Sequence, residues 1–424
     1  MKKIYIVGAG ICGISAAVQI AENFKNQNVE VIVVAEKFTP NTTSDLVAGL
    51  WGPYLMGSTP EHKIVQWSKT THEYFHHLWL NGLAEEAGIT MIPCYRLSAE
   101  EEIQNPCWKN IVFGFRELTS QEISKMSREH RRKYLSGSNF VTFCCEPIKF
   151  IPFMTKRFIK AGGKLETRKL RDFDELKDAD LIVNCTGLGG KELGDEQLHP
   201  IRGQITRVSA PWMYFVMIDD SDDGNYIIPN AESVVLGGTH QYNDFNTKFS
   251  TSDNDFIMNG CQRMVKSLEN AERLRDIVGL RPGRDQVRLE IVHGTNGKAP
   301  VIHNVGHGGC GVTLSWGCGQ EVLEKTVEVM KGMSKLFHIA TFAILQVNLV
   351  YSAVLTCNST TPPCVVTSIT PVTSPYELIT IDGQPSNYID ETTTDLSFNA
   401  PNILNYVPTN VFNIFPKTQS NYFV

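Results

Sequence analysis

The stretch KIYIVGAGICGISAAVQIAENF, residues 3–24, decides the fold of this chain. Its first five residues form an apolar run typical of a buried parallel strand. Gly8, Gly10 and Gly13 follow in the pattern G-x-G-x-x-G, and the segment after them predicts a helix. A second apolar run, VEVIVVA at 29–35, ends directly before Glu36. The sequence thus predicts a strand, a glycine turn, a helix and a second strand that ends at an acid.

This arrangement suits the binding of a dinucleotide. Gly8 permits a tight turn, Gly10 lets a pyrophosphate approach the backbone, and Gly13 lets helix and strand pack closely. The helix N-terminus presents unpaired N–H groups and a favourable dipole to phosphates. Glu36 stands 23 residues after Gly13, close to the spacing of about 20 for an acid that binds ribose hydroxyls. The pattern predicts a dinucleotide-binding unit and leaves NAD and FAD as alternatives.

A third apolar strand is predicted only much later, at DLIVNCTG, residues 180–187. Well over a hundred residues separate it from the second predicted strand at 29–35. A compact doubly wound sheet would bring in its third strand sooner. The spacing therefore predicts a substrate domain that is inserted into the nucleotide-binding unit.

The composition is that of an ordinary globular protein up to residue 336 and changes after it. The chain has 424 residues, of which 42% are hydrophobic and 20% charged, and its formal net charge is −6. Because no long basic run is present, we expect no nucleic-acid partner and, for residues 1–336, no stable membrane partner. From residue 337 onward only six Asp, Glu, Lys or Arg occur among many Thr, Ser, Pro and Asn. The range 337–424 is predicted to be an irregular, poorly ordered C-terminal extension.

Residues 37–55, KFTPNTTSDLVAGLWGPYL, begin a series of ordered motifs. The others are VNCTGLG at 183–189, IRGQI at 201–205, YIIP at 226–229, LGGTHQ at 236–241, VGLRPGRDQVRLE at 278–290 and VIHNVGHGGCGVTLSWG at 301–317. With the glycine turn in front of them, the chain resembles the D-amino-acid oxidase and D-aspartate oxidase family of FAD enzymes from residue 1 to about residue 336. The resemblance implies that FAD is the cofactor.

The fold implied by this resemblance is α/β. A Rossmann-like FAD-binding domain is joined to an inserted α+β substrate domain that contains a mixed sheet. We assign residues 1–50, 140–200 and 283–336 to a discontinuous FAD-binding domain, and residues 51–139 and 201–282 to the substrate domain. The extension at 337–424 has no counterpart in the family.

The resemblance also assigns residues to FAD. These are Gly8, Ala9, Gly10, Ile11 and Gly13 in the glycine turn; Glu36 and Lys37 near the adenosine ribose; Thr42, Thr43, Ser44, Ala48, Gly49 and Leu50 in a loop near the flavin; and Gly308, Gly311, Val312 and Thr313 near its ring. Glycines suit the last position, because only a backbone without side chains can lie against a flat ring.

Three residues are predicted to bind the reacting part of the substrate. Arg281 matches the family arginine that grips the α-carboxylate, Tyr226 the tyrosine whose hydroxyl also binds it, and Gly309 the glycine whose carbonyl oxygen receives the substrate amine. The family reaction transfers a hydride from Cα of a D-amino acid to flavin N5. The resulting imino acid hydrolyses to a 2-oxo acid and ammonia, and O₂ becomes H₂O₂. Considered singly, Arg281 could be a turn arginine and Tyr226 a strand aromatic.

Two further positions bear on the substrate side chain. The motifs FVTFCCEP at 140–147 and GGTHQ at 237–241 resemble the aspartate branch, which favours D-aspartate or D-glutamate, with neutral D-amino acids as the alternative. Where that branch has arginines, this chain has His240 and Asp219. A side-chain carboxylate needs a positive partner in a dry pocket. His240 is therefore predicted to bind it when protonated, whereas Asp219 would repel it unless Asp219 points away.

A competing motif stands at residues 72–76, HEYFH, which matches the H-E-x-x-H pattern of zinc metalloproteases. A third ligand at the usual downstream spacing is missing from the sequence. We therefore predict no metal site and interpret residues 72–76 as part of an amphipathic helix with the histidines on its surface.

The tripeptide Ser334-Lys335-Leu336 is a peroxisomal address when it stands at a free C-terminus. Members of the resembled family often end in such a tripeptide, and an H₂O₂-producing enzyme fits a compartment that contains catalase. If the chain ends at Leu336, we expect peroxisomal localisation and the peroxisomal import receptor as a partner. With residues 337–424 attached, the location is cytoplasmic or open.

Overall fold

The computed structural model describes residues 1–100, 106–221, 224–295 and 298–332, together with four short strands between residues 353 and 385. Met1–Met330 form one compact unit and Lys331–Val424 a second. Among the described residues, no helix is long and apolar enough to cross a bilayer. Within the same ranges, no group of three or more His, Cys, Asp or Glu is placed to hold a metal ion.

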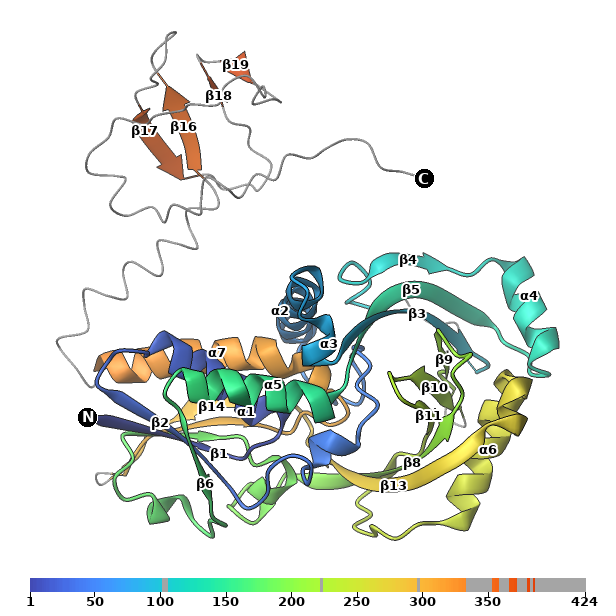
Figure 1. Cartoon of the computed structure of the whole chain (residues 1–424), viewed down its shortest axis with the longest axis horizontal. Helices are drawn as coiled ribbons and strands as arrows, with labels where there is room; N and C mark the ends of the chain where they lie inside the picture. Colours follow the sequence, from blue (N-terminus) through green and yellow to red (C-terminus); the bar gives the residue numbers. More distant parts are fainter. Residues whose placement is uncertain are drawn as a thin grey trace. The chain divides into compact units, whose positions relative to one another are not determined.

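The first unit contains a six-stranded sheet with the glycine turn at its centre (Figure 1). In sheet order its strands are β14 (Arg288–Val292), β15 (Val301–Val305), β7 (Leu181–Asn184), β1 (Lys2–Val7), β2 (Val29–Ala35) and β6 (Lys164–Thr167). All neighbours are parallel except β14 and β15. The three strands predicted from apolar runs are β1, β2 and β7, and they lie side by side. The sequence analysis missed β6, because KLET is a short, mostly exposed edge strand without an apolar run.

Three helices gather on one face of this sheet: α1 (Ile11–Asn23), α5 (Pro147–Lys160) and α7 (Gly311–Gly332) (Figure 1). α1 and α7 approach each other closely at Gly319, where an added Cβ would overlap the side chain of Gln19. Gln19 Nε2 also donates a 3.1 Å hydrogen bond to the carbonyl oxygen of Trp316. This packing holds the N-termini of α1 and α7 beside the same edge of the sheet.

A nine-stranded mixed sheet forms the other half of the unit. Its main path runs β12 (Gln241–Tyr242), β8 (His199–Ser209), β11 (Val234–Gly237), β10 (Tyr226–Pro229), β9 (Val216–Asp219), β3 (Ile89–Ser98), β5 (Ser136–Cys145) and β4 (Phe113–Glu117), and β13 (Glu272–Gly283) also pairs with β8. Only the pairing of β3 with β9 is parallel among these contacts.

Alternation along the strands gives this sheet two different faces. Ile227 and Leu236 face α6 (Thr251–Met264) and pack with its Ile257 and Cys261 in a buried cluster. Their neighbours in the chain, such as Tyr226, point to the opposite face. That opposite face lines the cavity described below.

The remaining elements of the first unit are connections. They are the helices α2 (Glu61–Leu80), α3 (Ala84–Ala87) and α4 (Ser120–Glu129) and the 3₁₀ turns η1 (Thr43–Leu46), η2 (Phe173–Glu175), η3 (Gly187–Lys191) and η4 (Lys266–Asn270). The predicted division into FAD-binding and substrate domains stays a prediction. β5 runs across its boundary at residue 140, since Ser136–Cys145 pair with β3 along their whole length.

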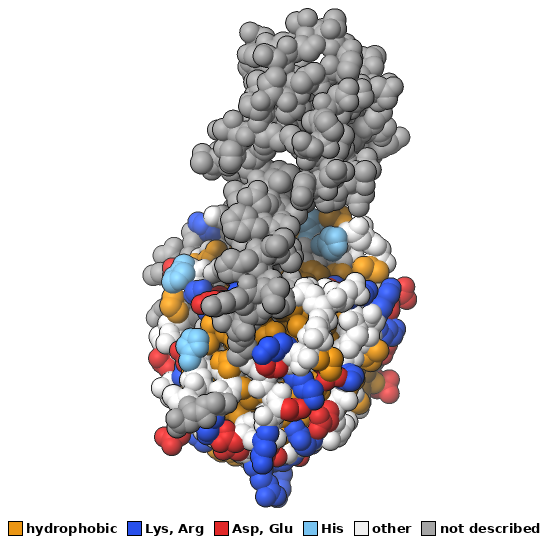
Figure 2. Space-filling view, turned by 90° about the vertical axis from the view of Figure 1, so that its left-hand side faces the viewer, with side chains coloured by type: hydrophobic (Ala, Val, Ile, Leu, Met, Phe, Trp, Pro, Cys, Tyr) orange, Lys and Arg blue, Asp and Glu red, His pale blue; other side chains and the backbone are white. Residues whose placement is uncertain are grey.

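Apart from Lys331 and Gly332 at the end of α7, the second unit is described only at β16 (Ala353–Cys357), β17 (Val366–Pro371), β18 (Thr380–Ile381) and β19 (Gln384–Pro385), which form a four-stranded sheet. The other residues of the predicted irregular extension, and the tripeptide Ser334–Leu336, lie outside the described residues. On the described face shown in Figure 2, acidic and basic side chains are interspersed. The expected absence of a nucleic-acid partner remains a prediction.

Candidate active site

A continuous cavity of about 870 Å³ runs from the glycine turn to the inner face of the nine-stranded sheet. The predicted residues that line it are Gly8, Ala9, Gly10, Ile11, Glu36, Lys37, Thr42, Thr43, Ser44, Ala48, Gly49, Leu50, Tyr226, His240, Arg281, Gly308, Gly309, Gly311 and Val312. Two predicted residues, Gly13 and Thr313, do not line it. The tertiary structure thus brings together residues from both ends of the first unit.

The glycine turn is built as its pattern predicts. Gly8 has φ 111°, and an added Cβ would overlap the carbonyl oxygen of Cys185. Gly13 acts behind the cavity wall: an added Cβ would overlap the carbonyl oxygen of Gly8, so this glycine lets α1 pack on the turn. α1 starts after Gly10, which contributes no capping side chain. The N-terminus of α1 therefore faces the cavity, where its dipole favours a phosphate.

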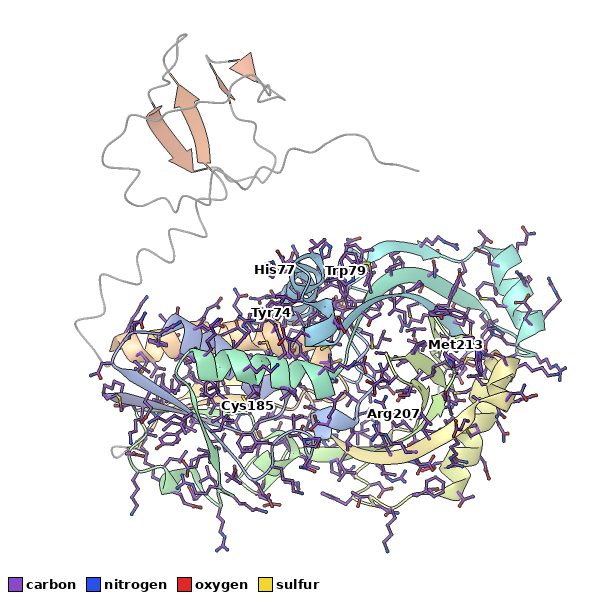
Figure 3. The ribbon with its side chains drawn as sticks, viewed as in Figure 1. Tyr74, His77, Trp79, Cys185, Arg207 and Met213 are labelled. Carbon is purple, nitrogen blue, oxygen red and sulfur yellow. The ribbon has the colours of Figure 1, made fainter. Side chains whose placement is uncertain are left out.

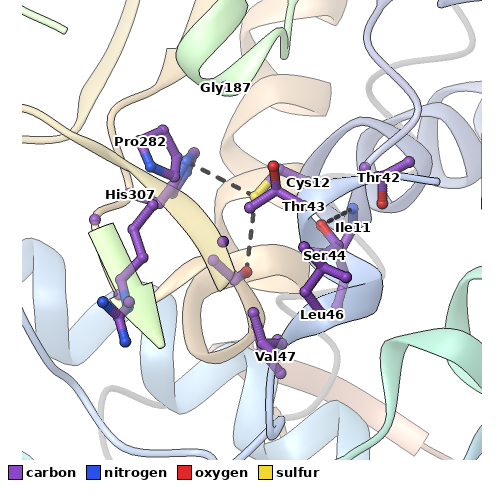
Figure 4. A pocket seen from close by; sticks show the side chains of 18 of the residues that line it. Ile11, Cys12, Thr42, Thr43, Ser44, Leu46, Val47, Gly187, Pro282 and His307 are labelled. Carbon is purple, nitrogen blue, oxygen red and sulfur yellow. Dashed lines mark hydrogen bonds between the residues drawn. The ribbon is translucent and has the colours of Figure 1, made fainter. Parts of the chain in front are cut away.

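Ser44 closes this end from the neighbouring loop (Figure 4). Its Oγ accepts a 3.0 Å hydrogen bond from the backbone N–H of Ile11, and it lies 3.1 Å from where a Cβ on Gly10 would stand. Thr42 caps the turn η1, since its hydroxyl donates 2.7 Å to Asp45 Oδ2. The loop is thus held in shape by its own hydroxyl and carboxylate groups.

Glu36 and Lys37 follow β2 at the outer end of the cavity. Glu36 lies 3.8 Å from Lys169 Nζ, which also pairs with Glu192 at 3.1 Å. Lys169 and Glu192 line the same end but were not predicted. Lys169 and Glu192 are more than a hundred residues away from Glu36 in the sequence, and no local motif singles them out.

The loop that includes residues 48–50 is pinned against the nine-stranded sheet. Gly49 has φ 83°, and an added Cβ would overlap the carbonyl oxygen of Cys145. The carbonyl oxygen of Ala48 accepts a 2.9 Å hydrogen bond from Asn230 Nδ2. The loop consequently runs between the two sheets with little side-chain bulk.

Residues 308–312 form the facing wall. Gly308 has φ 53°, and an added Cβ on Gly309 would stand 2.6 Å from Cδ1 of Tyr54. Thr313 lies behind this wall, where its Oγ1 accepts 3.1 Å from the backbone N–H of Gly52. Thr313 therefore positions the loop at residue 52 and does not face the cavity. The role predicted for it at the flavin remains untested.

His307 is a buried cavity residue that the sequence analysis did not single out. Its Nε2 lies 3.1 Å from Asn304 Oδ1, and its Nδ1 lies 3.8 Å from Cys12 Sγ (Figure 4). Burial lowers the pKa of His307 to about 4. This imidazole is thus neutral near pH 7 and adds no positive charge to the cavity.

Arg281 and Tyr226 meet at the inner end of the cavity, and glycines make room for both. Arg281 Nη1 donates a 2.9 Å hydrogen bond to the carbonyl oxygen of Thr239. An added Cβ on Gly203 would overlap the guanidinium of Arg281, and one on Gly237 would overlap the ring of Tyr226. Burial raises the pKa of Tyr226, and the charge of Arg281 opposes that rise. Glycine inside a strand is the signal that points to such close approaches.

His240 and Asp219 stand where the aspartate branch has arginines, and their side chains have different surroundings. Both residues line the cavity. Asp219 has a fully buried side chain whose Oδ2 lies 3.0 Å from Arg132 Nε and 3.3 Å from Arg263 Nη2. The carboxylate also accepts 2.7 Å from Ser221 Oγ. The negative charge of Asp219 is thus paired with two arginines that do not line the cavity, which weakens its repulsion of an anionic ligand.

Of the H-E-x-x-H residues, His72 is buried, His76 is half-buried and Glu73 is exposed, so the predicted surface position is wrong for His72. They lie on α2, whose Tyr74, His77 and Trp79 are labelled in Figure 3. The ring centroid of His72 lies 4.9 Å from those of Trp51 and Phe143. Burial lowers the pKa of His72 to about 4. This histidine is a packed neutral side chain.

A dinucleotide turn that opens directly onto a chamber lined by an arginine and a tyrosine is typical of a dinucleotide-dependent oxidoreductase. The family model described as "DAO: FAD dependent oxidoreductase" matches residues 3–325. The chain belongs to this family, and FAD is its cofactor. The glycine turn, the N-terminus of α1 at the cavity and the glycine-rich wall at residues 308–311 fit that cofactor.

Individual relatives agree with this assignment. The chain is 35% identical to D-aspartate oxidase of Homo sapiens over 338 residues, which are 78% of this chain and 96% of that protein. It is also 35% identical to D-amino acid oxidase of Dugesia ryukyuensis over 337 residues, 77% of this chain and 98% of that protein. The structure of glycine oxidase from Geobacillus kaustophilus shares the fold, with a TM-score of 0.61 at 18% identity over 77% of this chain and 95% of the other.

Proposed function

We propose that this protein oxidises D-amino acids, and acidic ones in preference, to 2-oxo acids with release of ammonia and H₂O₂. The observation that carries the proposal is the placement of Arg281 and Tyr226 at the inner end of the cavity whose other end fits FAD. The names of the relatives, D-aspartate oxidase and D-amino acid oxidase, support the same reaction class.

Each residue has a chemical task in this proposal. The planar guanidinium of Arg281 binds the α-carboxylate through two parallel hydrogen bonds, and the Tyr226 hydroxyl donates a third. The carbonyl oxygen of Gly309 accepts a hydrogen bond from the amine. These contacts fix the direction of the Cα–H bond, which is the main task of the protein when the cofactor does the chemistry. FAD supplies the two-electron acceptor for that hydrogen, and O₂ is the final oxidant.

The acidic preference rests on the side chains around the substrate. His240 lines the cavity, and the charge of Asp219 is neutralised by two arginines outside it. Apolar side chains line the same chamber, among them Trp108, Phe140 and Ile228. They favour the second candidate, oxidation of neutral D-amino acids.

A panel of D-amino acids with an H₂O₂ readout tests the proposal. D-Asp, D-Glu, D-Asn, D-Gln and D-Ala should be compared, with the L enantiomers as matched controls. We expect oxidation of the D forms only, with the highest kcat/KM for D-Asp or D-Glu. Equal rates on D-Asp and D-Ala would exclude the acidic preference, and no H₂O₂ from any of them would refute the reaction.

Localisation is a separate proposal. We propose that a chain that ends at Leu336 is directed to the peroxisome by its import receptor, whereas the full chain is not. Truncation after Leu336 and fluorescence microscopy test this, with Leu336→Asp in the truncated chain as the control. Peroxisomal signal from the full chain, or none from the truncated one, would contradict it.

A further inference from the structure

Arg96 shares a row of side chains with Tyr226 on the cavity face of the nine-stranded sheet. The register pairs Arg96 with Ile218, and Ile218 with Tyr226. Paired residues of neighbouring strands project to the same face. Arg96 and Tyr226 are thus two strands apart, about 10 Å between Cα atoms. Both line the cavity.

Arg96 is held in the chamber wall by two contacts. Its Nη2 forms an ion pair with Asp220 Oδ2, and its guanidinium carbon lies 6.0 Å from the ring centroid of Trp108. Asp220 is itself fixed, since its backbone N–H donates 2.7 Å to the carbonyl oxygen of Leu97. The side chains of Arg96 and Asp220 are 23% and 29% exposed, so the pair is open toward the cavity without being a free surface pair.

Where the aspartate branch has two arginines, this chain has His240 and Asp219. Arg96 can supply the positive charge that a second substrate carboxylate needs. In the proposed function Arg281 binds the α-carboxylate. The negative charge of Asp219 is paired with Arg132 and Arg263. A second substrate carboxylate in this chamber needs a charged partner. Arginine keeps its charge at every physiological pH, and its five donors can bind two carboxylates at once. Arg96 can therefore hold Asp220 and a ligand carboxylate together.

We propose that Arg96 binds the side-chain carboxylate of acidic D-amino acids, with Asp220 as the residue that positions it. This inference rests on the proposed oxidation of D-amino acids. It adds a residue on β3 that lies outside every motif of the sequence analysis. It also makes the recognition of the side chain independent of protonation at His240.

Substrates of nearly the same shape but different charge separate the effect of this charge contact on kcat/KM from the effect of packing. D-Asp and D-Asn differ chiefly in the side-chain charge, as do D-Glu and D-Gln. In the full-length holoenzyme, Arg96→Gln should lower the ratio of kcat/KM for acid over amide by about 10- to 100-fold, the worth of a hydrogen bond to a charged group. Arg96→Lys should retain part of that ratio. The kcat/KM for D-Ala should change by less than about threefold, because D-Ala has no second carboxylate.

Two further variants keep the test decisive. Arg116→Gln is the matched control, since Arg116 lies on β4 of the same sheet, pairs with Glu122 at 2.8 Å and does not line the cavity. Asp220→Asn should raise the acid-over-amide ratio, because it removes the competing negative charge and keeps a side-chain oxygen that can hold the Arg96 guanidinium in place. This variant also decides the matter if Arg96→Gln does not fold with bound FAD.

The outcomes distinguish this inference from the proposed function. If D-Ala or D-Asn is oxidised but the ratio is the same in the parent, Arg96→Gln and Asp220→Asn, only the role of Arg96 is overturned. A parent that prefers D-Lys, and loses that preference in Asp220→Asn, would assign the pair to basic side chains and overturn it too. If no D-amino acid is oxidised, both proposals fail together.

Discussion

The guanidinium of Arg281 occupies the space that a side chain at Gly203 would fill. These residues lie on the paired strands β13 and β8, with Arg281 opposite Ile201 and Gly203 opposite Gly279. An added Cβ on Gly203 would overlap three atoms of the guanidinium. The missing side chain on one strand therefore sets the position of the charged group on the other.

Replacement of Arg281 should remove most activity while FAD stays bound. In Arg281→Ala the α-carboxylate loses its bidentate partner, and we expect kcat/KM for D-amino acids to fall on the order of 10²-fold or more. The flavin absorbance should be unchanged. Arg275→Ala, which removes an exposed arginine of the same strand outside the cavity, is the control. Activity within a few-fold of the parent would make Arg281 a structural residue.

A Cβ at residue 203 should act through Arg281. We expect Gly203→Ala to lower kcat/KM by about tenfold or more, because a displacement of roughly 1 Å at an orienting group costs that much. In the Arg281→Ala background the same change should have little further effect, since residues in contact are not additive. Steady-state kinetics of the parent, the two single variants and the double variant measure the coupling between Gly203 and Arg281. Additive losses would show that Gly203 matters for another reason, such as the strand itself.

Asp219 should matter for stability more than for substrate charge. Asp219→Ala leaves Arg132 and Arg263 without their shared carboxylate, which we expect to cost about 3–5 kcal/mol of unfolding free energy. Glu73→Ala, which breaks an exposed pair with Lys69 on α2, should cost about 0.5 kcal/mol or less. Chemical denaturation at pH 7.5 measures both. An equal effect of the two substitutions would argue against a buried charge cluster at Asp219.

Acid should destabilise the protein through its buried histidines. Burial lowers the pKa of His72, His303 and His307 to about 4, below the value of about 6.5 for an exposed histidine. Between these values the unfolded chain binds more protons, so the contribution of each is complete above about pH 6.5 and is lost as pH falls through about 4.

The share that His72 contributes can be isolated with His72→Phe. Between pH 7.5 and pH 5, this variant should lose less unfolding free energy than the parent, by on the order of 1–2 kcal/mol. Comparison of the two pH values cancels the packing effect of the larger ring. His303 and His307 remain in both proteins and provide the residual slope. Identical pH dependence of parent and variant would show that His72 is not buried in its neutral form.

Local patterns in the sequence were enough for β1, α1 and β2 of the six-stranded sheet. The run from Lys3 to Glu36 carries a strand, a turn, a helix and a second strand, and each depends on residues within a few positions of one another. The positive φ at Gly8 and the close packing at Gly13 follow from the glycine pattern alone. β6 was not predicted because a short, polar edge strand has no local signal. Lys169 was not predicted because it follows β6 and comes close to Glu36 only when β6 pairs with β2.

Membership of the FAD-dependent family could also be predicted from ordered motifs, and the same motifs singled out Arg281 and Tyr226, which the structure places at the cavity. The residues that surround Arg281 and Tyr226 could not be predicted from these motifs. Arg96, Ile218 and Tyr226 are more than a hundred residues apart at their extremes, and they become neighbours only through the register of β3, β9 and β10. Alternation predicts which residues of one strand share a face, but not which strand pairs with it. Register depends on long-range packing, so only the tertiary structure decided that Arg96 faces the chamber and Asp219 turns to the arginines behind it.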